Sequence, residues 1–181
     1  LSELRGAICR CEPLSVKLHP NKTNTDKKIS YFTARFTDTE VPSEFKEADI
    51  IFIPLFSPVT EFERLIQTGF NVAAEIPRGM FGRENQIRLR LIELKKAGVS
   101  NVLASNIGAV YLAKELGFDI HGGFGLNITN TESILFYENL GLKSIELSFE
   151  LTKNQIKDLG GSIPRGIIAA GYLPLMLTRA C

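Results

Sequence analysis

Short apolar strand patterns alternate with amphipathic helix patterns along most of this chain, and that alternation restricts its fold more than any other feature. A glycine stands between a helix pattern and the next strand pattern at Gly69, Gly98, Gly117 and Gly141. Glycine adopts the left-handed conformation that ends a helix before a short turn. Strands that alternate with helices in this way predict a parallel sheet with right-handed crossovers.

The hydrophobic periodicity sets the boundaries of the expected elements. The expected strands are 29–36, 49–55, 71–76, 101–105, 119–124, 143–149 and 165–170. The expected helices are 58–69, 83–97, 107–116, 131–140 and 152–159. We expect Thr60 to cap the first of these helices, and Leu89 to widen the buried face of the second.

About seven strand–helix units of similar length favour a barrel over a doubly wound sheet, which stays open as the alternative. No glycine-rich dinucleotide fingerprint follows the first strand, and polar residues recur at the carboxyl ends of the strands. The prediction is a TIM-type (β/α) barrel of α/β class over 29–181, after an irregular segment at 1–28. A typical barrel has eight strands and about 250 residues. We therefore expect a truncated barrel, incomplete at its C-terminus.

Composition excludes several classes of protein. The 181 residues carry a formal net charge of +1, which argues against nucleic-acid binding by bulk charge but leaves a local basic patch possible. There is no apolar run of about 18 residues and no signal peptide, so we expect a cytoplasmic protein without a membrane partner. Of the three cysteines, Cys9 and Cys11 are interpreted as ordinary reduced thiols, because their spacing fits no zinc pattern.

The strand 143–149 places polar side chains on one face. Glu146, Ser148 and Glu150 share one parity, and burying such a row is costly unless it meets partners or a ligand. Ser148 and Glu150 are therefore candidate catalytic residues, whereas a structural ion pair is the expectation for Glu146.

Three further candidates flank other elements. Asn127 lies between a strand and a helix with no evident local role, and Asn106 directly precedes a helix, where capping is the competing interpretation. Arg179, near the end of the sequence, is also a candidate catalytic residue. The alternative interpretation is a solvated surface charge. Glu75 is expected to pair with Arg78 or with a neighbouring barrel residue.

Proteolysis has little motif support. The sequence lacks the G-x-S-x-G and H-E-x-x-H patterns, and His121 is one of only two histidines. We interpret His121 as a structural histidine.

Five short sequence motifs together resemble those of a known family. They are EIPRG at 75–79, VLASNIG at 102–108, NITNT at 127–131, ELSFEL at 146–151 and GYLPLMLTRAC at 171–181. They are similar to the collagenase-like peptidase family (peptidase family U32), in particular to a barrel portion of its longer bacterial members. The resemblance runs from about residue 29 to Cys181.

The resemblance implies a TIM-type barrel and two competing activities. The family is named for proteolysis, yet several members look like hydroxylating enzymes that act on RNA bases or on the ubiquinone ring and use a four-cysteine iron–sulfur cluster. Cys181 resembles the first cysteine of that set, so it is the expected cofactor and metal ligand. One matching cysteine does not hold such a cluster, and we expect none in this chain alone, which is then inactive.

The sequence thus leaves three functions open. The protein that contains this chain is expected to be an iron–sulfur-dependent hydroxylation enzyme acting on RNA bases or a related substrate. The alternatives are a protease of the same family, and a non-catalytic barrel that binds RNA or a partner protein.

Overall fold

The computed structural model describes residues 31–172 and residue 177. Within them the strands are β1 (Thr33–Arg35), β2 (Ile50–Pro54), β3 (Val72–Glu75), β4 (Asn101–Ala104), β5 (Asp119–Gly122), β6 (Ser144–Glu146) and β7 (Arg165–Gly166). The helices are α2 (Val59–Gln67), α3 (Glu84–Lys96), α4 (Ile107–Glu115), α5 (Thr131–Leu140) and α6 (Lys153–Asp158), with 3-10 turns η1 (Ser43–Glu47) and η2 (Phe124–Leu126). The predicted segment 1–28, Arg179 and all three cysteines lie outside the described residues.

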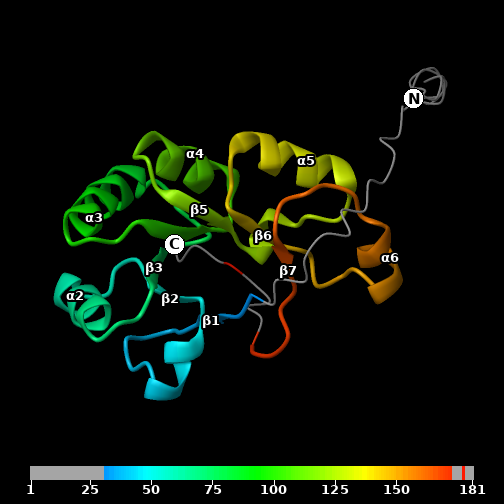
Figure 1. Ribbon diagram of the computed structural model, residues 1–181. Coiled ribbons are helices and arrows are strands. Elements are labelled where there is room, and N and C mark those ends of the chain that lie inside the picture. Colours follow the sequence, from blue (N-terminus) through cyan, green and yellow to red (C-terminus); the bar gives the residue numbers. More distant parts are fainter. Residues whose placement is uncertain (1–30, 173–176, 178–181) are drawn as a thin grey trace.

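The seven strands form one sheet in the order in which they occur along the chain. Each strand pairs in parallel with the next, from β1 to β7. The sheet curls into a half-barrel with the helices along its outer side (Figure 1). The expectation of about seven parallel strands is confirmed. The doubly wound alternative is wrong, because that fold requires a point at which the strand order reverses.

Alternate residues of the strands face opposite sides of the curled sheet. One large cluster joins outward-facing strand residues such as Ile51 and Ile53 to the helices. A smaller apolar cluster consists of Ile50, Phe52, Ala73 and Leu103 on the other parity, which is the inner face. All residues of β2 from Ile50 to Ile53 are buried, as predicted for a strand covered on both sides.

Glycine ends the helices as expected. The φ angles are +91° at Gly69, +93° at Gly98, +72° at Gly117 and +87° at Gly141, all in the left-handed region that favours glycine.

Two details of the helix prediction are wrong. Pro58, not Thr60, occupies the N-cap of α2, and Thr60 lies inside the first turn. Leu89 is 68% exposed, because two residues along a helix turn it by about 200° away from buried Ile87.

Three predicted strands end earlier than expected. β5 stops at Gly122 and the chain turns into η2, while β7 has only two residues. β6 stops at Glu146, because Leu147 leaves the regular ladder and bridges to Ile128 in the connection before α5. Among the described residues, no helix is long and apolar enough to cross a membrane.

Candidate functional site

Polar and aromatic side chains gather on the inner face where the strands end. Arg35, Glu75 and Glu146 are the last residues of β1, β3 and β6, Arg78 follows β3, and Phe124 begins η2. Their contacts, described below, join them into one group, which we call the mouth cluster. Parallel strands bring their carboxyl ends to one edge of the sheet, so residues far apart in sequence meet there.

Arg35 and Glu75 form a two-pronged ion pair across β2. The Nε atom of Arg35 donates to Oε2 of Glu75 at 2.6 Å, and its Nη2 atom donates to Oε1. The Glu75 side chain is 15% exposed and that of Arg35 39%. The expected pair of Glu75 with a neighbouring barrel residue is thus present, with Arg35 as the partner instead of Arg78.

Phe124 is the aromatic centre of the cluster. Its buried ring lies 5.5 Å from the guanidinium carbon of Arg35 and 5.6 Å from that of Arg78. The half-exposed ring of Phe149 lies 6.2 Å away in a tilted arrangement. Cations near the face of a ring are attracted by its quadrupole, so Phe124 holds both arginines in the mouth cluster.

Glu146 is a largely buried carboxyl group. Its Oε2 atom accepts a hydrogen bond from the Phe124 backbone N–H at 2.8 Å. Burial raises the pKa of Glu146 and nearby Glu75 adds to the rise, while the N–H bond and Arg35 oppose it. Within the described residues no ion pair includes Glu146, so the structural ion pair expected from the sequence is replaced by a backbone hydrogen bond.

Arg78 and Ser105 have unused hydrogen-bonding capacity beside the cluster. Within the described part of the chain, the Arg78 guanidinium has the Phe124 ring as a contact but no carboxylate partner. The Ser105 side chain is buried and its Oγ has no hydrogen-bond partner there. A Cβ on Gly125 would lie 2.8 Å from Cδ of Arg78 and 2.6 Å from the Ser105 carbonyl oxygen, so glycine is what lets the three residues meet.

A second polar group joins His121, within β5, to Asn101 and Ser144, the first residues of β4 and β6. His121 contacts Ser144 Oγ through Nδ1 at 2.7 Å and Asn101 Oδ1 through Nε2 at 3.2 Å. Burial lowers the pKa of His121 to about 4, with Lys143 acting in the same direction and Asp119 against it. A neutral ring fits this pattern, with Nε2–H donating to Asn101 and Nδ1 accepting from Ser144.

The candidate residues taken from the sequence lie around the mouth cluster rather than in it. The Ser148 hydroxyl is buried and accepts from the Glu150 N–H at 3.4 Å, while Glu150 itself is exposed. Asn127 is exposed and has a left-handed φ of +50°. Among the described residues, no hydrogen bond or ion pair joins these three to Arg35, Glu75 or Glu146.

Asn106 caps α4, as its alternative interpretation predicted. Its Oδ1 accepts from the Ala109 N–H at 2.8 Å, and its Nδ2 donates to the Arg78 carbonyl oxygen at 3.0 Å. It thereby fixes the loop that carries Arg78. Arg179 and Cys181 lie outside the described residues, so their expected roles stay predictions.

Sequence reasoning missed Arg35 and Phe124 as site residues. Arg35 offered one usable signal, because a charged residue within a short strand is costly to bury without a partner. Phe124 offered none, since an aromatic residue after two glycines also fits a bent strand.

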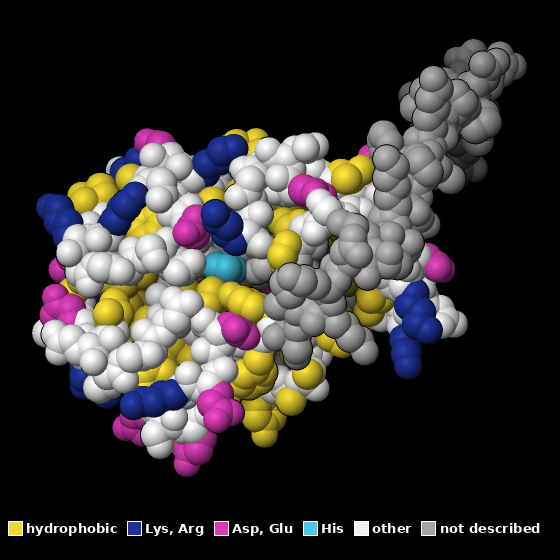
Figure 2. Space-filling model, in the orientation of Figure 1, with side chains coloured by type: hydrophobic (Ala, Val, Ile, Leu, Met, Phe, Trp, Pro, Cys, Tyr) yellow, Lys and Arg dark blue, Asp and Glu magenta, His cyan; other side chains and the backbone are white. Residues whose placement is uncertain are grey.

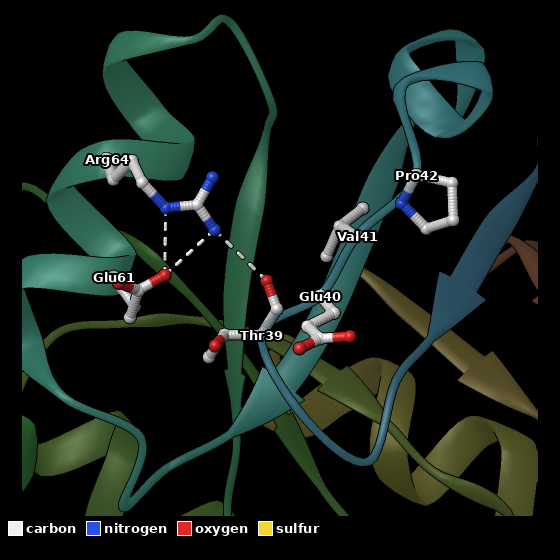
Figure 3. A pocket seen from close by; sticks show the side chains of 6 residues that line it. All are labelled: Thr39, Glu40, Val41, Pro42, Glu61 and Arg64. Carbon is white, nitrogen blue, oxygen red and sulfur yellow. Dashed lines mark hydrogen bonds and ion pairs between the residues drawn. The ribbon is translucent and has the colours of Figure 1, made fainter.

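A shallow groove of about 640 Å³ lies away from these residues. It is lined by Thr39, Glu40, Val41, Pro42, Glu61 and Arg64 (Figure 3). Arg64 already donates to Glu61 and to the Thr39 carbonyl oxygen, so the groove offers no free cation. Within the described residues, no group of three or more His, Cys, Asp or Glu side chains could hold a metal ion.

The raised pKa of Glu146 predicts a specific dependence of stability on pH. The folded chain keeps the Glu146 proton at pH values where the unfolded chain has lost it. Stability contributed by this group is therefore complete below the unfolded pKa of about 4.3 and is lost as the pH rises through the folded pKa. We expect Glu146→Gln, which keeps an acceptor for the Phe124 N–H, to remove this loss.

Urea unfolding at pH 4 and pH 7 measures the effect. As a control, Glu115→Gln removes an exposed carboxyl group whose pKa is lowered by Arg88, so it should leave the loss in place. Identical pH dependence in wild type and Glu146→Gln would contradict the assignment.

Comparison with known proteins gives a consistent family. The family model described as Peptidase family U32 matches residues 83–181. A protein named as an uncharacterized protease in Methanocaldococcus jannaschii is 41% identical over 63 residues, 35% of this chain and 15% of that protein. A Porphyromonas gingivalis collagenase is 32% identical over 71 residues, 39% of this chain and 17% of that protein.

A solved structure is similar to this chain in its fold. It is titled as the structure of a U32 peptidase, and it superposes with a TM-score of 0.57 at 15% identity. The superposition covers 82% of this chain and 72% of that one. By contrast, the matches to the two curated relatives span less than a fifth of either protein's length.

Proposed function

This chain belongs to peptidase family U32, and on that premise we propose that the mouth cluster is the substrate site of a TIM-type barrel enzyme. The observation that carries the proposal is Glu146, a largely buried carboxyl group with a raised pKa at the carboxyl ends of the strands. Active sites of TIM-type barrels lie at that end, and groups with perturbed pKa values concentrate at functional sites. The guanidinium of Arg78, which has no carboxylate partner among residues 31–172, supports the same assignment.

For the protein that contains this chain, we propose hydroxylation of RNA bases or of a related substrate. The support is the resemblance of the terminal motif, in which Cys181 corresponds to the first of four cluster cysteines. Such a cluster supplies the oxidative chemistry when it is bound. The three cysteines of this chain cannot by themselves complete a four-thiolate site, and none of them lies among the described residues.

The described side chains suit the handling of a planar, polar substrate. The half-exposed ring of Phe149 offers a face for stacking, which is sequence-tolerant for nucleic-acid bases. Protonated Glu146 can donate a proton to a substrate atom, and after ionisation it stays stabilised by the Phe124 N–H. Basic and acidic side chains are interspersed over the face shown in Figure 2. Contact with RNA would therefore be local and would not depend on a broad positive field.

Iron and sulfide analysis tests the hydroxylase proposal. The protein that contains this chain is purified without oxygen, and its folding is checked by circular dichroism. We expect iron and inorganic sulfide to copurify with it. A folded protein without iron would contradict the proposal.

A peptidase is the second candidate, and one contact favours it. Ser144 and His121 form a hydroxyl–imidazole pair oriented by Asn101, which resembles the arrangement of a nucleophile, a base and an orienting group. Two observations weigh against it. A histidine with a pKa of about 4 is a weak general base at neutral pH, and Ser144 is the first residue of β6, at the end opposite to the one where barrel active sites lie.

Digestion of gelatin separates the two candidates. If the protein that contains this chain is a peptidase of this kind, Ser144→Ala should abolish digestion, whereas Ser148→Ala should not. Digestion that persists in both Ser144→Ala and His121→Asn would exclude this pair as the nucleophile and base.

A further inference from the structure

The Arg78 guanidinium is a cation without a counterion in the described part of the chain. Arg35, its counterpart at the Phe124 ring, is neutralised by the two-pronged pair with Glu75. Arg64, Arg88 and Arg90 likewise pair with carboxylates on or between the outer helices. Arg78 is half-buried, and among the described residues its guanidinium contacts the Phe124 ring without a hydrogen bond, which leaves its donors available there.

Neighbouring residues fix the position of Arg78 and leave room for its side chain. The Asn106 side chain donates to the Arg78 carbonyl oxygen and fixes the backbone. A Cβ at position 125 would clash with both the Arg78 side chain and the Ser105 carbonyl oxygen, so Gly125 leaves room for Arg78. Ser105 adds a second unused donor, since its Oγ is buried without a hydrogen-bond partner in the described residues. An unsatisfied buried hydroxyl costs stability, and it is tolerated where a ligand or a ligand-induced shift can satisfy it.

We propose that Arg78 binds an oxyanion, a carboxylate or a phosphate group of the substrate, at the mouth cluster. A guanidinium presents donors in a fork that matches two oxygens of either group. The charges of the mouth cluster also favour an anionic ligand. Arg35 is cancelled by Glu75, and Glu146 is the remaining carboxyl group of the cluster, so a net positive charge persists whenever Glu146 is protonated.

The inference rests on the proposed location of the substrate site, but it can be tested without turnover. Thermal unfolding of the chain is followed with added inorganic phosphate or acetate, against sodium chloride at equal ionic strength. A ligand that binds the folded chain raises its unfolding midpoint. Phosphate also stabilises proteins nonspecifically, so the comparison among variants is what decides.

The variants are Arg78→Gln and a matched control, Arg83→Gln. Arg83 also lies over an aromatic ring, 4.6 Å from the centroid of Phe56, but outside the mouth cluster. We expect Arg78→Gln to weaken binding by about tenfold or more, the value of a hydrogen bond to a charged group, and Arg83→Gln to match wild type. An Arg78-dependent shift with phosphate, acetate or both identifies the group; equal shifts in all three proteins would overturn the proposal.

A titration of the unmodified chain covers the case in which Arg78→Gln does not fold. Amide NMR shifts with phosphate or acetate should be largest at Arg78, Phe124 and Gly125. Shifts confined to other regions would overturn the proposal. Such a failure would leave the assignment of Glu146 intact, because that assignment is tested through activity.

Discussion

Acidification from pH 6.5 to pH 4 is expected to lower the free energy of unfolding by about 3 kcal/mol through His121 alone. The folded chain holds His121 neutral with a pKa of about 4, because its side chain is buried. The unfolded chain binds a proton at its ordinary pKa of about 6.5. Stability from this group is therefore complete above pH 6.5 and falls as the unfolded state takes up the proton.

The measurement is urea unfolding at several pH values between 4 and 7.5 for wild type and His121→Asn. The asparagine keeps polar atoms near Ser144 and Asn101 but does not titrate in this range. His19 is present in both proteins, so its titration cancels in the comparison. The difference between the two stability curves should shrink as the pH falls. A difference that stays constant from pH 7.5 to 4 would contradict the burial of a neutral His121.

Gly123→Ala is expected to destabilise the chain by about 2 kcal/mol, with recovery on adding Ser105→Ala. A Cβ at Gly123 would lie 2.2 Å from the Ser105 Oγ, and its next neighbours, on Leu103, are at 3.4 Å. Removing the hydroxyl therefore removes the clash. Ser105→Ala alone should be close to neutral, because it deletes a buried hydroxyl without a hydrogen-bond partner in the described residues.

Two other glycines provide the controls for this cycle. Gly125→Ala would place a Cβ 2.6 Å from the Ser105 carbonyl oxygen, which Ser105→Ala does not remove, so it should not recover. Gly166→Ala meets nothing within 4 Å and should be nearly silent. Chemical unfolding of the single and double variants gives the coupling energy. Equal losses with and without Ser105→Ala would show that Gly123 and Ser105 do not meet.

The arrangement of the strands was predictable because it depends on local signals. The apolar run at 49–55 and the glycines that follow helices, such as Gly69 and Gly98, each report their own conformation. The ends of the strands were less predictable, because β6 ends where Leu147 finds a partner, Ile128, in another connection. The hydrophobic periodicity of residues 143–149 does not indicate that contact.

The candidate site was predictable only in its position at the carboxyl ends of the strands. Its composition depends on contacts between distant residues. Arg35 meets Glu75 across an intervening strand, and Glu146 meets the backbone of Phe124. Sequence parity did place Glu146 on the polar face of its strand. It could not show that the carboxyl group would be buried without an ion pair in the described structure, which is what makes it chemically notable.

The proposal that the mouth cluster is the substrate site is best tested by comparing Glu146→Gln with Glu115→Gln. Both substitutions remove one carboxyl group, but Glu115 is on the outer helix α4, paired with Arg88. Each variant of the protein that contains this chain is returned to cells lacking the gene, and total RNA nucleosides are analysed by mass spectrometry. Under this proposal, we expect a hydroxylated nucleoside that wild type and Glu115→Gln restore and Glu146→Gln does not. Full restoration by Glu146→Gln would contradict it.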